Sequence, residues 1–230
     1  MRVLRAARDA GVRRVVLTSS FAAIGYGHDG PGPYDEATWT NLDAPIGAYV
    51  KSKTVAERAA WKYAVAAGLE LTVINPTGIF GPALGPDFAS SLGVITALLE
   101  GRLPFLPDQR FGVADVRDVA ALPLVAMTDD RAAGQRFIAS GGYSSMAGIA
   151  GILRSRLGAD AAKVPTRRIP TWLLKAVALV VRPLRALARD AGVRREPRLG
   201  KATRVLGWSP RPVEGTIVDT ARSLLPYLSR

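Results

Sequence analysis

Tyr49 and Lys53 lie four residues apart in a segment, 48–67, that contains neither glycine nor proline. At this spacing two side chains project from the same face of a helix. A free tyrosine has a pKa near ~10 and is poorly ionised at neutral pH, but a neighbouring ammonium favours the phenolate. Such a phenol can protonate a developing alkoxide or deprotonate an alcohol. The same spacing also occurs on solvated helix faces, so the pair needs a chemical context.

Three hydroxyl residues supply that context. Thr18, Ser19 and Ser20 close the segment 12–20, whose β-branched apolar residues predict a buried strand. A hydroxyl at the end of this strand can hydrogen-bond a substrate carbonyl held near Tyr49. Strand-end hydroxyls also cap turns, which is the structural alternative.

Other kinds of chemistry are excluded by composition. The chain has no cysteine and one histidine, His28, in a loop where we expect it to be solvated. Thiolate metal sites, cysteine nucleophiles and a conventional Ser-His triad are therefore ruled out, and no metal site is predicted. Any catalysis must come from other side chains.

The expected elements place these groups at one edge of a sheet. We expect a helix at 3–10, a strand at 12–20, a long Gly/Pro-rich connection at 25–43, a helix at 47–67 and a strand at 69–74, stopped by Asn75-Pro76. In a doubly wound α/β fold, ligands bind beyond the carboxyl ends of the strands. Further helices are expected at 89–100, 116–127, 144–157, 171–189, 199–206 and 213–225, with a short strand at 135–139.

Charge is distributed unevenly along the 230 residues. The net charge of +12 comes from residues 151–230, which hold 17 Lys and Arg against 5 Asp and Glu, whereas residues 1–150 hold 14 of each. We expect solvated, Arg-rich helix faces there, with an anionic partner as the alternative. With 48% hydrophobic residues and no membrane span or leader expected, the sequence predicts a soluble, cytoplasmic globular protein.

Six segments of the chain have a recognisable order and spacing. They are VVLTSS at 15–20, DEATW at 35–39, YVKSKTVAER at 49–58, NPTGIFGP at 75–82, DVRDVA at 115–120 and LGWSPRP at 206–212. Through these segments the chain resembles the extended short-chain dehydrogenase/reductase superfamily, also called the NAD-dependent epimerase/dehydratase family. Within it, the chain resembles the branch of dihydroflavonol 4-reductases and related aldehyde or ketone reductases.

The resemblance implies a role for each site residue. Tyr49 would be the proton donor, Lys53 would assist it and hydrogen-bond the nicotinamide ribose, and Ser20 would orient the carbonyl. Contacts to NADP(H) or NAD(H) would come from Thr18, Ser19, Tyr49, Lys53, Pro76, Thr77, Gly78 and Ile79. Contacts to a small carbonyl or alcohol substrate would come from Ser20, Phe21, Tyr49 and Phe80. No nucleic acid partner is expected, and a homodimer stays open.

The chain departs from the family in one respect. It has no G-x-x-G-x-x-G pattern, and its one G-x-G-x-x-G match, Gly25 to Gly30, lies in the long connection at 25–43 and opens no expected helix, so the chain resembles a member truncated at its N-terminus. The implied fold is a partial doubly wound, Rossmann-like parallel sheet that lacks its first strands, with a mainly helical C-terminal subdomain. We expect residues 1–140 to bind the cofactor, with substrate-side segments near 80–112, and residues 141–230 to bind substrate. We also expect weak dinucleotide binding and poor folding of the chain alone.

These implications converge on reduction of an aldehyde or ketone, impaired in this chain. Phe21-Ala22-Ala23 follows the hydroxyl triplet where dehydratases place acidic residues, which argues against elimination chemistry. Sugar-nucleotide epimerisation, oxidation of a sterol-type alcohol and non-catalytic binding through the basic C-terminal third stay open.

Three smaller expectations concern packing and charge. We expect Glu57, one helical turn beyond Lys53, to balance the Lys53 ammonium. Trp39 and Trp208 are expected to pack in the interior. We expect Asp115 and Asp118 to cap a helix start rather than to take part in catalysis.

Overall fold

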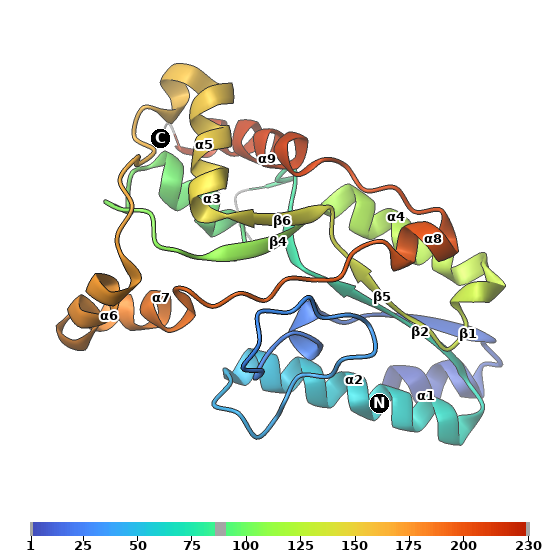
Figure 1. Cartoon of the computed structure of the whole chain (residues 1–230). Coiled ribbons are helices and arrows are strands. Elements are labelled where there is room, and N and C mark those ends of the chain that lie inside the picture. The colour runs from blue at the N-terminus through green and yellow to red at the C-terminus, as the bar shows by residue number, and fades with distance from the viewer. Residues whose placement is uncertain (1, 86–90, 229–230) are drawn as a thin grey trace. The chain divides into compact units, whose positions relative to one another are not determined.

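The computed structural model describes residues 2–85 and 91–228, which form two compact units that interleave along the chain (Figure 1). Unit 1 comprises residues 1–77, 117–141 and 195–210, and unit 2 comprises residues 78–116, 142–194 and 211–230. The division into a cofactor part at 1–140 and a substrate part at 141–230 concerns function and stays a prediction.

A three-stranded parallel sheet forms the centre of unit 1. Its strands β1 (Arg14–Thr18), β2 (Glu70–Pro76) and β5 (Arg136–Ala139) lie in the order β1-β2-β5. Thr18 pairs with Ile74, and Pro76 pairs with Ala139. The predicted parallel sheet is therefore confirmed, with β2 as the buried middle strand.

The expectation that β2 stops before Asn75-Pro76 is wrong. In the pairing with β5, every second amide of the chain points toward β5. The amide of Val73 donates to the carbonyl of Gln135 at 2.9 Å, and the amide of Thr77 donates to the carbonyl of Ala139 at 3.1 Å. Pro76 lies between these donors, so its missing N–H costs the ladder no bond on that side.

Helices cover both faces of this sheet. Figure 1 shows α1 (Arg2–Asp9) and α2 (Ala48–Ala67) on one face and α4 (Val116–Thr128) on the other. Leu4 of α1 and Ala64 of α2 are buried against Leu71 of β2. Gly68 ends α2 in the left-handed region, at φ 63°, as the sequence predicts. Helix α8 (Lys201–Leu206) also belongs to this unit.

Unit 2 is built on a second, mixed sheet that the sequence did not predict. Strands β3 (Gly78–Phe80) and β4 (Arg110–Asp115) are parallel, and β4 and β6 (Gly142–Ser145) are antiparallel. Helices α3 (Leu92–Leu99), α5 (Met146–Leu157) and α9 (Val213–Leu228) bury the apolar core of this unit. The predicted helix at 144–157 starts late because 142–145 is strand, and the predicted start at Ala89 lies outside the described residues.

The single long helix expected at 171–189 is wrong. The structure has α6 (Thr171–Val180), a short 3₁₀ turn (Arg182–Leu184) and α7 (Arg185–Asp190). Pro183 has no backbone N–H to donate to the carbonyl of Leu179, so the α-helical ladder ends there. Val181 leaves the helical region, with φ −92° and ψ 93°. Other 3₁₀ turns span Phe21–Ala23, Asp130–Ala132 and Gly158–Ala161.

Candidate active site

Tyr49 and Lys53 lie in the first two turns of α2 and are brought together as their spacing predicts. The Nζ atom of Lys53 is 6.0 Å from the centroid of the Tyr49 ring. Tyr49 exposes 61% of its surface, and Lys53 is half-buried beside it. The phenol can therefore reach a substrate while a cation stands next to its ring.

Ser20 follows the end of β1 and caps the 3₁₀ turn at 21–23. Its Oγ accepts a hydrogen bond from the amide of Ala22 at 3.1 Å. Among the described residues, the Ser20 hydroxyl donates to no protein group. A hydroxyl has one donor and two acceptor sites, so the capping bond leaves the Ser20 proton free for a carbonyl oxygen.

The segment after Ser20 packs directly on the helix that carries Tyr49. Thr54 is fully buried, and its hydroxyl lies 2.8 Å from the carbonyl of Val50 and 3.4 Å from that of Ala22. The turn that begins at Ser20 is thus in contact with α2, one turn beyond Tyr49.

A buried carboxylate on α2 links this helix to residues at the ends of strands β1 and β2. Glu57 of α2 is 1% exposed. Its Oε2 accepts hydrogen bonds from Ser19 Oγ at 2.5 Å and from Asn75 Nδ2 at 2.7 Å, and its Oε1 lies 2.7 Å from Nε of Arg136 in an ion pair. Asn75 Nδ2 also lies 3.1 Å from the backbone carbonyl of Ser20. The expectation that Glu57 balances Lys53 is wrong, because the carboxylate turns toward the sheet.

Arg136 extends this network to the loop at 25–43. Burial lowers the pKa of Arg136, and the negative charge of Glu57 opposes that shift. The Nη1 atom of Arg136 donates to the carbonyls of Glu36 at 2.9 Å and Thr38 at 2.8 Å, and the guanidinium lies 3.9 Å from the centroid of the Trp39 ring. The DEATW segment is therefore fixed to β5. No local sequence signal indicated this network, because the four-residue step from Lys53 to Glu57 predicts a different partner for the carboxylate.

The remaining cofactor candidates of unit 1 lie at the carboxyl ends of β1 and β2. Thr18 is exposed, whereas Ser19 is buried and its hydroxyl is already bound to Glu57. Pro76 is buried, and Thr77 donates through Oγ1 to the hydroxyl of Ser140 at 3.0 Å. Their contacts to a dinucleotide stay predictions.

The other candidates lie in packed regions. Gly78 and Ile79 belong to β3 of unit 2, and a Cβ atom at Gly78 would come within 2.9 Å of the carbonyl oxygen of Gly112. Close pairing with β4 therefore accounts for this glycine. Phe21 is buried with Ile24 in unit 1, and Phe80 is buried in the core of unit 2. Their roles in substrate binding stay predictions.

Three aromatic residues have packing roles. Trp208 is buried and its Nε1 donates to the carbonyl of Asp118 at 3.0 Å, so its predicted packing is confirmed. Trp39 packs under Arg136. His28 makes more contacts than a solvated loop histidine would. Its ring stacks on Tyr34 with centroids 4.9 Å apart, and its Nε2 lies 3.2 Å from the carbonyl of Ile24.

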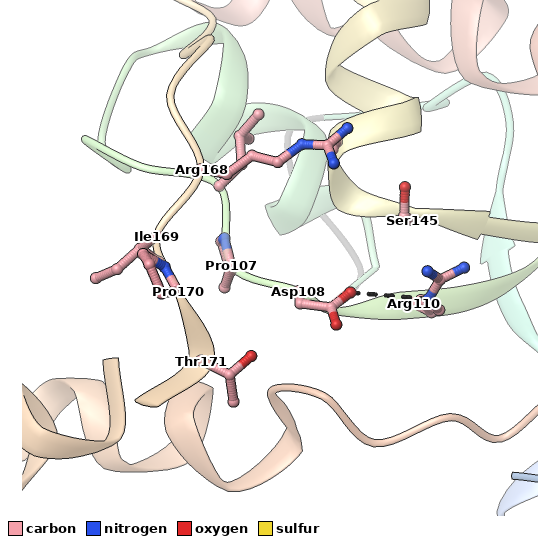
Figure 2. A pocket seen from close by; sticks show the side chains of 10 residues that line it. Pro107, Asp108, Arg110, Ser145, Arg168, Ile169, Pro170 and Thr171 are labelled. Carbon is pink, nitrogen blue, oxygen red and sulfur yellow. Dashed lines mark ion pairs between the residues drawn. The ribbon is translucent and has the colours of Figure 1, made fainter. Parts of the chain in front are cut away.

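A separate pocket of about 380 Å³ lies within unit 2. Figure 2 shows Asp108 and Arg110 on one side of it, 3.7 Å apart in an ion pair, with Arg168 and Thr171 on the segment leading into α6. None of the predicted site residues lines this pocket, so it is distinct from the cluster around Tyr49.

Comparisons with known proteins show the family of the chain. Residues 1–139 match the model of the NAD dependent epimerase/dehydratase family. The chain is 33% identical over 157 residues to tetraketide alpha-pyrone reductase 2 of Arabidopsis thaliana, covering 64% of this chain and 47% of that protein. It is 29% identical over 238 residues to NADPH-dependent methylglyoxal reductase GRE2 of Saccharomyces cerevisiae, covering 95% of this chain and 65% of that protein.

The fold has a close match among solved structures. The crystal structure of yeast methylglyoxal/isovaleraldehyde reductase Gre2 complexed with NADPH superimposes with a TM-score of 0.77 at 26% identity, covering 99% of this chain and 69% of that one. The expected Rossmann-like fold and the family resemblance are confirmed. The chain spans about half the length of the plant reductase it matches, 47%.

Proposed function

The chain belongs to the NAD dependent epimerase/dehydratase family, and from this premise we propose that it reduces an aldehyde or ketone to an alcohol with NAD(P)H, using Tyr49 as the proton donor. The observation that carries this proposal is the exposed Tyr49 phenol beside Lys53, on a helix packed against the turn that Ser20 begins. Two similar proteins are named as reductases, and one is named as NADPH-dependent.

Each of the three side chains has one task in the proposed reaction. The Ser20 hydroxyl donates to the carbonyl oxygen and polarises it. Bound NAD(P)H supplies the hydride that the carbonyl carbon receives. Tyr49 Oη gives its proton to the same oxygen, which completes the alcohol. The ammonium of Lys53 stabilises the phenolate that remains until solvent returns the proton.

The residues present fit the nicotinamide end of the cofactor. Lys53 is half-buried next to Tyr49, with donors that suit ribose hydroxyls, and Thr77 directly follows the end of β2. Gly25, Gly27 and Gly30 have the spacing of a dinucleotide-binding turn, but they lie in a loop that leads into no helix N-terminus, so they do not form the usual cradle for the pyrophosphate. We therefore expect weak NADPH binding and low activity. The assay is NADPH oxidation at high cofactor concentration, with methylglyoxal and a panel of aliphatic and aromatic aldehydes.

Replacing each serine of the pair Ser19 and Ser20 separates catalysis from packing. We expect Ser20→Ala to lower kcat by about 10²-fold, because the carbonyl loses a donor. We expect Ser19→Ala to lower the free energy of unfolding by about 1–3 kcal/mol, because the Glu57 carboxylate loses a buried donor. Steady-state kinetics and urea unfolding of both variants measure the two effects. A larger loss of kcat in Ser19→Ala than in Ser20→Ala would reverse the assignment.

A further inference from the structure

Large apolar side chains are exposed along one face of α6. Trp172 exposes 71% of its surface, Leu179 76% and Val180 86%, and Ala176 is also exposed. The four residues follow the i, i+4, i+7, i+8 pattern of a single helix face. We call these four residues the outer face of α6. Exposed apolar side chains that form one continuous row on a protein surface indicate an interaction site.

The outer face is not needed for the folding of the hairpin that α6 forms with α7. The opposite side of α6 carries Leu174 and Ala178, which are buried against Ala188 and Ala191. The hairpin therefore has its own small core, and the outer face is apolar in addition to it.

The hairpin of α6 and α7 carries four exposed cations. Lys175, Arg182, Arg185 and Arg189 are exposed, and in the part of the chain that the structure describes no carboxylate forms an ion pair with them. Arg185 donates to the carbonyls of Ala178 at 3.2 Å and Leu179 at 3.1 Å, which fixes its charge at the C-terminal end of α6. Residues 165–195 hold eight Lys and Arg against a single Asp.

An apolar helix face bordered by cations matches the interface of an anionic bilayer. A second copy of the chain fits less well, because a two-fold contact between outer faces would bring the cations of both copies together. A span is excluded by length, since the ten residues of α6 reach about 15 Å and a bilayer core is about 30 Å thick. No helix among the described residues is long and apolar enough to cross a membrane.

We propose that the outer face of α6 docks onto a lipid bilayer containing anionic lipids, with the helix lying in the plane of the interface. Trp172, Leu179 and Val180 enter the boundary between headgroups and acyl chains, and the cations of the hairpin contact the phosphates. This binding is independent of the proposed reduction and needs no cofactor.

Flotation with vesicles tests the proposal on the 230-residue chain. We expect the chain to float with phosphatidylcholine vesicles that contain phosphatidylglycerol, and much less with phosphatidylcholine alone. Leu179→Ser/Val180→Ser is expected to weaken this binding by more than about ten-fold. Lys175→Gln/Arg182→Gln/Arg189→Gln is expected to weaken it by about a hundred-fold, at about five-fold for each cation.

The matched control is Leu124→Ser/Met127→Ser on α4, where the side chains are 66% and 57% exposed. We expect this variant to bind vesicles as the unchanged chain does. A second readout is a blue shift of tryptophan fluorescence on vesicle addition that Trp172→Phe removes. Three results would overturn the proposal. The first is equal vesicle binding by Leu179→Ser/Val180→Ser and by the control Leu124→Ser/Met127→Ser, and the second is absence of binding to anionic vesicles. The third is an oligomer of the unchanged chain that dissociates in Leu179→Ser/Val180→Ser.

Discussion

Tyr49→Phe is expected to lower kcat for carbonyl reduction by about 10²- to 10⁴-fold, the range that a positioned general acid contributes. Phenylalanine keeps the ring beside Lys53 and removes only the hydroxyl group that is proposed to donate the proton. Because Tyr49 is exposed on the first turn of α2, we expect the stability of the chain to be unchanged. Steady-state rates with a fixed aldehyde and increasing NADPH measure the effect.

Tyr227→Phe is the matched control for this prediction. Tyr227 is also an exposed tyrosine on a helix, α9, and belongs to unit 2. We expect its substitution to leave kcat unchanged. If Tyr49→Phe keeps most of the rate while Tyr227→Phe behaves as the unchanged chain does, Tyr49 is not the proton donor.

Glu57→Ala is expected to destabilise unit 1 by about 3–5 kcal/mol, the cost of removing one partner of a buried ion pair. The substitution leaves the Arg136 guanidinium buried without its counter-charge and removes the acceptor for Ser19 and Asn75. Since whole domains are stable by only about 5–15 kcal/mol, this loss brings the chain close to unfolding. Urea unfolding followed by circular dichroism measures it.

An exposed ion pair provides the comparison. Arg8 and Asp9 of α1 form an ion pair in which the side chains are 47% and 58% exposed. We expect Asp9→Asn to leave the urea midpoint unchanged, because solvent screens such pairs. A similar shift in Asp9→Asn and Glu57→Ala would contradict the structural role of the Glu57 network.

The elements around the Tyr49 site could be predicted because local signals mark their ends. Gly11 and Gly68, both with positive φ, end helices α1 and α2, and the β-branched runs that follow them specify β1 and β2. The pairing of Tyr49 with Lys53 follows from helix geometry alone. These features depend on residues close together in the sequence.

The features that could not be predicted depend on contacts between distant residues. Glu57 has the same helical spacing from Lys53 that Lys53 has from Tyr49, and only the packing of α2 on the sheet decides that it meets Arg136. Strands β3 and β6 are three and four residues long, too short for a periodic signal, and become strands by pairing with β4. The break in the helix expected at 171–189 is an exception to this rule, because Pro183 marks it within the segment itself.

The product formed by the chain tests the central claim most directly. NADPH and an aldehyde are incubated with the chain, and alcohol and oxidised cofactor are quantified together by NMR spectroscopy and absorbance. The proposed function predicts alcohol and oxidised cofactor in equal amounts, with both formed about 10²- to 10⁴-fold more slowly by Tyr49→Phe. No alcohol with any carbonyl tested, or isomerisation of a sugar nucleotide with no net oxidation of cofactor, would contradict it.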